Sequence, residues 1–231
     1  MDRPAYQRHP FQEEMRSLAH DILEMGTRAE VMVALSVECL SNLNTTQARE
    51  VLARDDVIDQ QDLDIEARCL RILGLHQPLA GDLRAIGTAL KMITDLERIG
   101  DLAVDIAKIS MKIDKEFGDS TVIDLPRMGG VARQMLRTAL QAFVDRDLEK
   151  VQVVATLEEQ VDDLYRLLRE QLFDHMREYP ESVVADSWLL LAVHHLERIA
   201  DHCVNIVERV SFMITGELRE IVPDMPPRAA D

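Results

Sequence analysis

Apolar residues recur along this chain at intervals of three and four positions, the period of an α-helix, and no alternating strand pattern stands out. The pattern predicts six long helices, at about residues 11–42, 45–73, 79–115, 126–145, 148–178 and 182–216. The eight prolines interrupt none of these segments, as expected if they mark helix starts and tails. We therefore predict an all-α fold.

Short polar breaks separate the predicted helices. Asn44 and Asp147 stand directly before two of them, where a side-chain oxygen can accept hydrogen bonds from the free N–H groups of the first turn. The longest break opens at Gly118, Asp119 and Ser120, and it divides the chain into residues 1–117 and 118–222. The remaining residues, 223–231, are rich in proline, and we expect them to be disordered.

The chain repeats itself. Residues 96–106 read LERIGDLAVDI and residues 196–206 read LERIADHCVNI, with seven of eleven positions identical at an offset of 100. A fainter match, at an offset of 103, relates residues 55–59 to residues 158–162 and also relates the two predicted caps. We infer two homologous three-helix bundles in tandem, each packed antiparallel through short connections.

The bulk composition narrows the possible functions. A formal net charge of −16, without a clear Lys/Arg cluster, argues against binding nucleic acid or anionic lipid directly. Cys39, Cys69 and Cys203 each lie inside an apolar helical pattern, so we expect buried thiols in a reducing compartment. Neither a signal peptide nor an apolar run of roughly 18 residues is present. We expect a cytoplasmic protein.

Four acidic pairs with i,i+4 spacing fall at equivalent positions of the two halves, and this spacing places both side chains of a pair on one helix face. The pairs are Asp55/Asp59, Glu97/Asp101, Glu158/Asp162 and Glu197/Asp201. The last three interrupt apolar stripes, whereas Asp55/Asp59 looks more exposed to solvent. Half-buried carboxylates need a counter-charge. Either Arg98 and Arg198 supply it, or a metal cation with oxygen ligands does.

Catalysis has no support in the sequence. A di-iron oxidase bundle needs Glu-x-x-His on two helices, and the chain contains no such motif. His194, His195 and His202 cluster on one predicted helix, but a single histidine on a helix is seldom a ligand. Nucleophile, P-loop and dinucleotide-binding motifs are also missing. A carboxylate-bridged metal storage or oxidase bundle remains the alternative function, and a purely structural bundle without metal is a third.

The segments LERIGDLAVDIAK and LERIADHCVNIVE resemble the signature of the PhoU family, and QPLAGDLR at residues 77–84 is similar to the usual start of the family's third helix. The resemblance covers roughly residues 11–216. It implies two three-helix bundles and multinuclear metal clusters, one per repeat, with iron or zinc foremost and manganese, magnesium or nickel as alternatives. The implied ligands are Asp55, Asp59, Glu97 and Asp101 in repeat 1, and Glu158, Asp162, Glu197 and Asp201 in repeat 2.

The same resemblance implies a function without catalysis. Members of the family act as negative regulators of the phosphate-starvation response. They are thought to link the ATPase subunit of a phosphate transporter to a sensor histidine kinase, often as homodimers. We would then expect recruitment to the inner membrane through these proteins. The repeats differ at Leu102 against His202 and at Asp105 against Asn205, so the two metal sites need not be equal.

Overall fold

The computed structural model describes residues 5–113 and 123–221 of the chain. The predicted break at Gly118–Ser120 and the tail at residues 223–231 lie outside the described residues. Within them, the six predicted helices are all present and no strand occurs, which confirms the all-α fold class. The helices are α1 (Ala5–Ser41), α2 (Thr45–His76), α3 (Gly81–Ile109), α5 (Leu125–Asp145), α6 (Leu148–Glu178) and α7 (Val183–Thr215).

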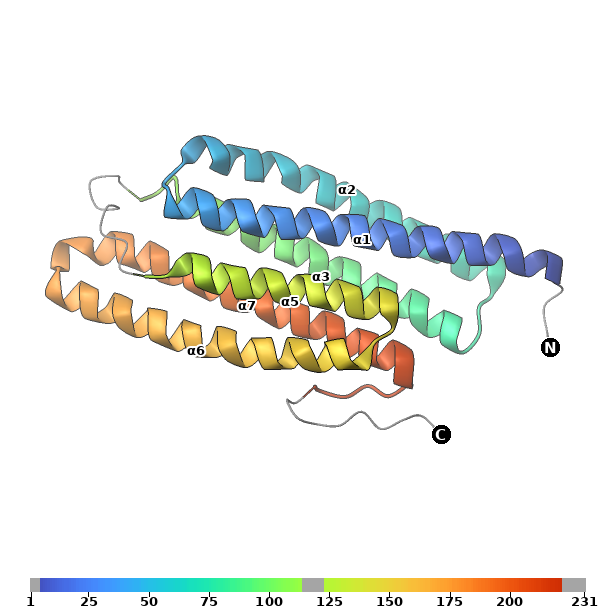
Figure 1. Cartoon of the computed structure of the whole chain (residues 1–231). Helices are drawn as coiled ribbons and strands as arrows, with labels where there is room; N and C mark the ends of the chain where they lie inside the picture. Colours follow the sequence, from blue (N-terminus) through green and yellow to red (C-terminus); the bar gives the residue numbers. More distant parts are fainter. Residues whose placement is uncertain (1–4, 114–122, 222–231) are drawn as a thin grey trace.

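The helices form two antiparallel three-helix bundles that lie side by side (Figure 1). Helices α1, α2 and α3 make the first bundle, and α5, α6 and α7 make the second. The seam between them is built from α1 against α5 and α3 against α7, whereas α2 and α6 lie on the outer sides. Both the tandem repeat and its packing therefore follow the sequence prediction.

Side-chain caps begin three of the helices. Asn44 accepts hydrogen bonds from the backbone N–H groups of Thr46 and Gln47, and Asp147 accepts one from Glu149 at 2.9 Å, which confirms both predicted caps. Asp124 caps α5 in the same way through the N–H of Arg127, a role that the sequence analysis did not assign. Each cap satisfies donors that the helix itself leaves unpaired.

One prediction about helix ends is wrong. Helix α1 begins at Ala5 and contains Pro10, so this proline does not mark the helix start. Because Pro10 is the sixth residue of the helix, its missing N–H costs a single hydrogen bond close to the N-terminal end. The thirty-one helical residues after it keep an unbroken apolar face against α2, α3 and α5.

Small residues bring the two bundles together at the seam. Gly26 on α1 faces Leu140, and Gly129 on α5 faces Val37, with no room for a further side chain at either position. The three cysteines are buried as free thiols, as predicted, and burial raises the pKa of Cys69 to about 11. None of the described helices has an apolar stretch long enough to cross a bilayer.

Candidate metal centres

The first acidic set lies between α2 and α3. Asp55 and Asp59 extend from α2, and Glu97 and Asp101 extend from α3. Asp55 is half-buried, although its pair was expected to face solvent. Burial, followed by the charges of Asp59 and Asp101, raises the pKa of Asp55 to about 6. Because the charge of Asp101 on α3 raises the pKa of Asp55 on α2, the two predicted pairs face one another across the helices.

Helix packing explains why Asp55 is covered. Gly100 stands on α3 opposite this residue, and a methyl group at Gly100 would lie 3.3 Å from Ile58 Cδ1 and 3.5 Å from Asp55 Oδ1. The missing side chain lets α2 approach α3 closely. Ile58 then fills the core beneath the acidic set, and Asp55 is held over the surface of α3.

Asp62 is a further member of this set. Burial raises its pKa, and the charges of Glu66 and Asp59 add to the shift. Its Oδ1 atom is buried and has no hydrogen-bond partner in the described part of the chain. Burial, Asp101 and, more weakly, Asp62 also raise the pKa of Glu97, while Arg98 opposes the shift. The sequence analysis did not include Asp62 in this set, because nothing in its spacing indicated an unsatisfied oxygen.

Arg98 provides the counter-charge in the first set. Its guanidinium lies 3.4 Å from Glu97 and 2.9 Å from Asp101, so the ion pair expected as an alternative to metal does form in repeat 1. The Arg98 side chain is 56% exposed, however, and exposed ion pairs typically stabilise a protein by about 0–1 kcal/mol. The guanidinium can therefore leave the acidic set at little cost.

The second acidic set lies between α6 and α7 and has the same design. Burial raises the pKa of Glu158, and the charges of Asp162 and Asp201 raise it further. The pKa of Asp201 is raised by burial first, against an opposing effect of His202, and then by Asp162. All four predicted members thus take part in one group of mutually repelling carboxylates drawn from two helices.

The counter-charges differ between the two sets. Among the described residues Arg198 makes no ion pair, so the structural role expected for it is not present. His194 lies instead 3.1 Å from Glu197 Oε2, a contact that becomes an ion pair when the imidazole is protonated. Burial and Asp201 raise the pKa of Glu197, and His194 opposes the shift.

The chemistry of both sets fits a cation with oxygen ligands. Each offers at least four carboxylates and mutual repulsion that a cation would relieve, and in the first set the buried Asp62 Oδ1 has no hydrogen-bond partner among the described residues. In the described part of the chain, no three His, Cys, Asp or Glu side chains lie close enough to ligate one ion as placed. Binding would therefore require side-chain rotations, which the half-buried positions of Asp55 and Asp101 and the exposed position of Asp201 permit.

Polar contacts that the sequence analysis missed join the two repeats between the acidic sets. Asp95 on α3 lies 2.9 Å from His202 Nδ1 and accepts a hydrogen bond from Asn205 on α7. At the repeat-equivalent position of Asp95, the buried His195 feels the charge of Asp105, which opposes the lowering of its pKa by burial. His202 and Asn205, at two positions where the repeats differ, therefore make polar contacts across the seam.

A Ser-His-Asp group closes the corner between α6 and α7, but its geometry is not catalytic. Ser182 Oγ and Asp186 Oδ2 both approach the same ring nitrogen, Nδ1 of His175, at 3.2 and 2.7 Å. A catalytic triad needs the two partners on opposite nitrogens of the ring. The His175 and Asp186 side chains are only 10% and 5% exposed, so the group fastens the short turn at residues 180–182 onto both helices.

Comparison with known proteins identifies the fold and the repeat. The family described as "PhoU domain" matches twice, over residues 22–110 and 125–210. Phosphate-specific transport system accessory protein PhoU homologs are similar along most of the chain. The homolog from Clostridium acetobutylicum is 34% identical, over 90% of this chain and 95% of that protein. The one from Deinococcus radiodurans is 30% identical, over 90% of this chain and 98% of that protein.

Solved structures agree with this similarity. The crystal structure of PhoU from Pseudomonas aeruginosa has a TM-score of 0.82 at 31% identity, covering 90% of this chain and all of that one. PhoU from Streptococcus pneumoniae, a phosphate transport system regulatory protein, has a TM-score of 0.85 at 29% identity, covering 91% and 100%. With two family matches, one in each bundle, the chain belongs to the PhoU family.

Proposed function

We propose that this chain is an accessory regulator of a phosphate-specific transport system and acts as a metal-binding adaptor without catalytic activity. Family membership over both repeats carries the regulatory part of the proposal. In detail, the adaptor is a homodimer that connects the ATPase subunit of the transporter with a sensor histidine kinase and keeps the kinase silent when phosphate is plentiful. Long exposed faces of α2 and α6 offer such partners room to dock.

The metal-binding part rests on the eight acidic residues. Asp55, Asp59, Glu97 and Asp101 would hold metal in repeat 1, and the equivalent set of repeat 2 is Glu158, Asp162, Glu197 and Asp201. Bound cations would neutralise carboxylates whose pKa values burial and mutual repulsion now raise. Because each set spans two helices, the cation would fix α2 against α3 and α6 against α7, and would stabilise the bundles by mass action.

Metal analysis of a double variant tests this part. Glu197→Gln with Asp201→Asn removes two charges from repeat 2 with little change of shape. We expect the purified variant to lack the metal of repeat 2. Chelator should also lower the melting temperature of the variant less than that of wild type, because one metal site is already lost. The exposed pair Glu170→Gln with Asp174→Asn, which has the same spacing on α6, is the control and should change neither quantity.

Two results would contradict metal binding in repeat 2. One is an unchanged metal content in the double variant. The other is a wild-type protein whose melting temperature does not respond to chelator.

The regulatory part has its own test, because deletion of the gene should switch on phosphate-starvation genes in phosphate-rich medium. Continued repression in the deletion strain would show that this chain does not hold the kinase silent.

A further inference from the structure

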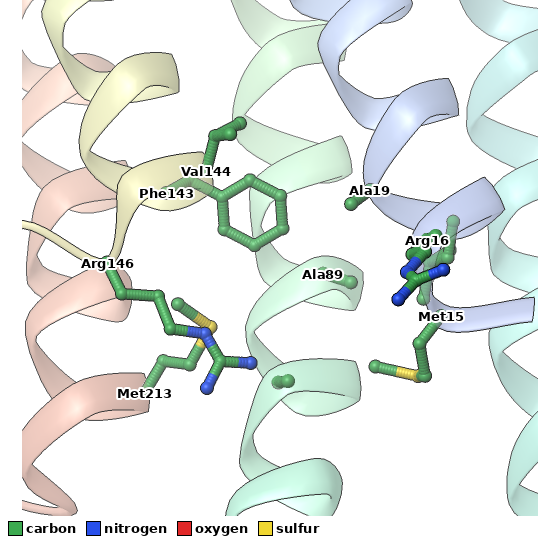
Figure 2. Close-up of a pocket in the computed structure, with 10 residues that line it drawn as sticks. Met15, Arg16, Ala19, Ala89, Phe143, Val144, Arg146 and Met213 are labelled. Atoms are coloured by element: carbon green, nitrogen blue, oxygen red, sulfur yellow. The ribbon is translucent and has the colours of Figure 1, made fainter. Parts of the chain in front are cut away.

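A hollow opens on the seam of the two repeats, away from both acidic sets. It has a volume of about 220 Å³ and is lined from four helices, two of each bundle (Figure 2). Its wall is mostly apolar, with Phe143 of α5, Met15 of α1 and Met213 at the end of α7 around it. None of the eight candidate metal ligands contributes to it, so its role is separate from theirs.

The hollow exists because small residues occupy positions where the seam is otherwise filled by larger ones. Ala19 on α1 and Ala85 and Ala89 on α3 line it, and each ends at Cβ. A leucine at any of these three sites would project into the space. Elsewhere in the seam, Leu140 and Val37 fill the equivalent gap against glycine.

Two arginines stand at the open side of the hollow. Figure 2 shows Arg16 and Arg146 extending toward it from opposite sides, one from α1 and one from the end of α5. Among the described residues neither guanidinium has a hydrogen-bond or ion-pair partner. Both side chains are exposed, so the opening of this apolar hollow carries positive charge in a chain whose net charge is −16.

Arg146 lies where α5 ends. This residue is the C-cap of α5 and has a left-handed conformation, with φ of 51° and ψ of 51°. Glycine is the residue that most often holds this position, because other side chains are strained there. An arginine at this cap therefore costs stability and places its side chain over the hollow (Figure 2).

We propose that this hollow receives one large apolar side chain of a protein partner, from a segment that carries acidic residues beside that side chain. The volume favours an anchor over a small-molecule ligand, because pockets for drug-sized ligands measure about 300–1,000 Å³. Apolar anchors seated in a pocket with polar groups at its rim are the usual centres of protein interfaces. The two guanidiniums at the opening complement acidic residues on the partner, and they disfavour a basic segment.

Occupation of the hollow would also affect the fold around it. An anchor seated there contacts α1 and α3 of repeat 1 together with α5 and α7 of repeat 2, so it joins both repeats at once. The partner would therefore recognise how the two bundles are placed against each other, because it would contact both of them and not a single helix. Any change in their relative position would alter the hollow, because its wall is shared between them.

Methyl NMR of methionine-labelled protein tests the proposal, since Met15 and Met213 line the hollow and report on it directly. The probes are the capped tripeptides Glu-Phe-Glu, Glu-Ala-Glu and Lys-Phe-Lys. We expect Glu-Phe-Glu to shift both methyl signals in a saturable manner, with a dissociation constant in the millimolar range. Glu-Ala-Glu lacks the anchor and Lys-Phe-Lys has the wrong charge, so neither should saturate the site.

Two pairs of variants identify the groups responsible. Ala19→Leu fills the hollow and should abolish the shifts, whereas Ala34→Leu, on the same helix but away from the hollow, should not. Arg16→Glu with Arg146→Glu should reverse the preference, so that Lys-Phe-Lys binds about tenfold more tightly than Glu-Phe-Glu. Arg49→Glu with Arg127→Glu, which changes two exposed arginines elsewhere, is the matched control.

The reversal keeps the test independent of stability, because an unfolded variant would bind neither peptide and would lose its dispersed methyl signals. The proposal is overturned if Glu-Phe-Glu binds the doubly reversed variant as well as it binds wild type. It is also overturned if octanoate shifts the two methyl signals while neither phenylalanine peptide does, since the hollow would then serve a small fatty acid.

Discussion

Asp55 shows how a single carboxyl reports on its acidic set. Burial and the charges of Asp59 and Asp101 raise its pKa from 3.8 to about 6. Between about pH 4 and pH 6 the folded chain therefore holds a proton that the unfolded chain has released. The free energy of unfolding consequently falls as the pH rises through this window, and the full cost is present above it.

Replacing Asp55 with Asn removes that cost. In chelator-treated protein we expect the variant to be more stable than wild type by about 1 kcal/mol at pH 8, a value discounted for the partial exposure of the carboxyl. At pH 4 the two proteins should be nearly equal. Urea unfolding at both pH values measures the difference, with the exposed Glu50→Gln on the same helix as control. A gain of the same size at both pH values would contradict the assigned cause.

Asp186 permits a second test at the residue scale, because it is buried against His175 and Ser182 at the corner between α6 and α7. Asp186→Ala leaves the buried His175 without its carboxylate and should lower the free energy of unfolding by about 3 kcal/mol. The same change at the exposed Asp174, which pairs with Arg177, should cost about 0–1 kcal/mol. Equal losses in thermal melts would show that the corner is not held by this group.

Which residues could be predicted depends on the range of the interaction. The caps at Asn44 and Asp147 were visible in the sequence because a cap involves only its own first turn. The acidic pairs could be recognised in the sequence because they occur at equivalent positions of both repeats. The choice of Arg98 in one set and His194 in the other depends on side-chain directions between helices. No local pattern contains that information, and the seam contact of Asp95 with His202 was missed for the same reason.

At the scale of elements, the seam between α1 and α5 depends on glycine. A methyl group at Gly129 would lie 2.7 Å from Val37 Cγ2, and a β-branched side chain in a helix has little freedom to move aside. At the next residue, Gly130, no heavy atom of the described chain outside its own stretch of helix lies within 4 Å of the same position. Two adjacent glycines of one helix thus have different roles, which periodicity alone did not reveal.

These two glycines provide a matched pair of variants. Gly129→Ala should lower the free energy of unfolding by about 1–3 kcal/mol through overpacking of the seam. Gly130→Ala should raise it by about 0.5–1 kcal/mol, because alanine favours the helix and meets open space. Chemical denaturation of both variants gives the comparison. If both changes stabilise the protein, then α1 and α5 can separate at no cost, and the close seam is not required by the fold.

At the scale of the whole molecule, the repeat places an acidic set between an inner and an outer helix on each side of one shared seam. Asp95, two residues before Glu97, contacts His202, which directly follows Asp201. The two sets are therefore connected through α3 and α7 by a polar contact that is 15–18% exposed. Both helices belong to the seam between the two bundles (Figure 1), so this contact lies where the two repeats meet.

The overall charge decides how such a molecule can reach a membrane. A net charge of −16 repels anionic lipid. We therefore expect recruitment by proteins.

In sedimentation assays at physiological salt, the chain should remain in the supernatant with protein-free anionic vesicles, and should pellet with membranes that contain the phosphate transporter or the kinase. Vesicles of neutral lipid serve as the control for trapping. Strong binding to the anionic vesicles would require a basic or apolar membrane-binding face, and would replace protein-mediated recruitment with direct attachment to lipid.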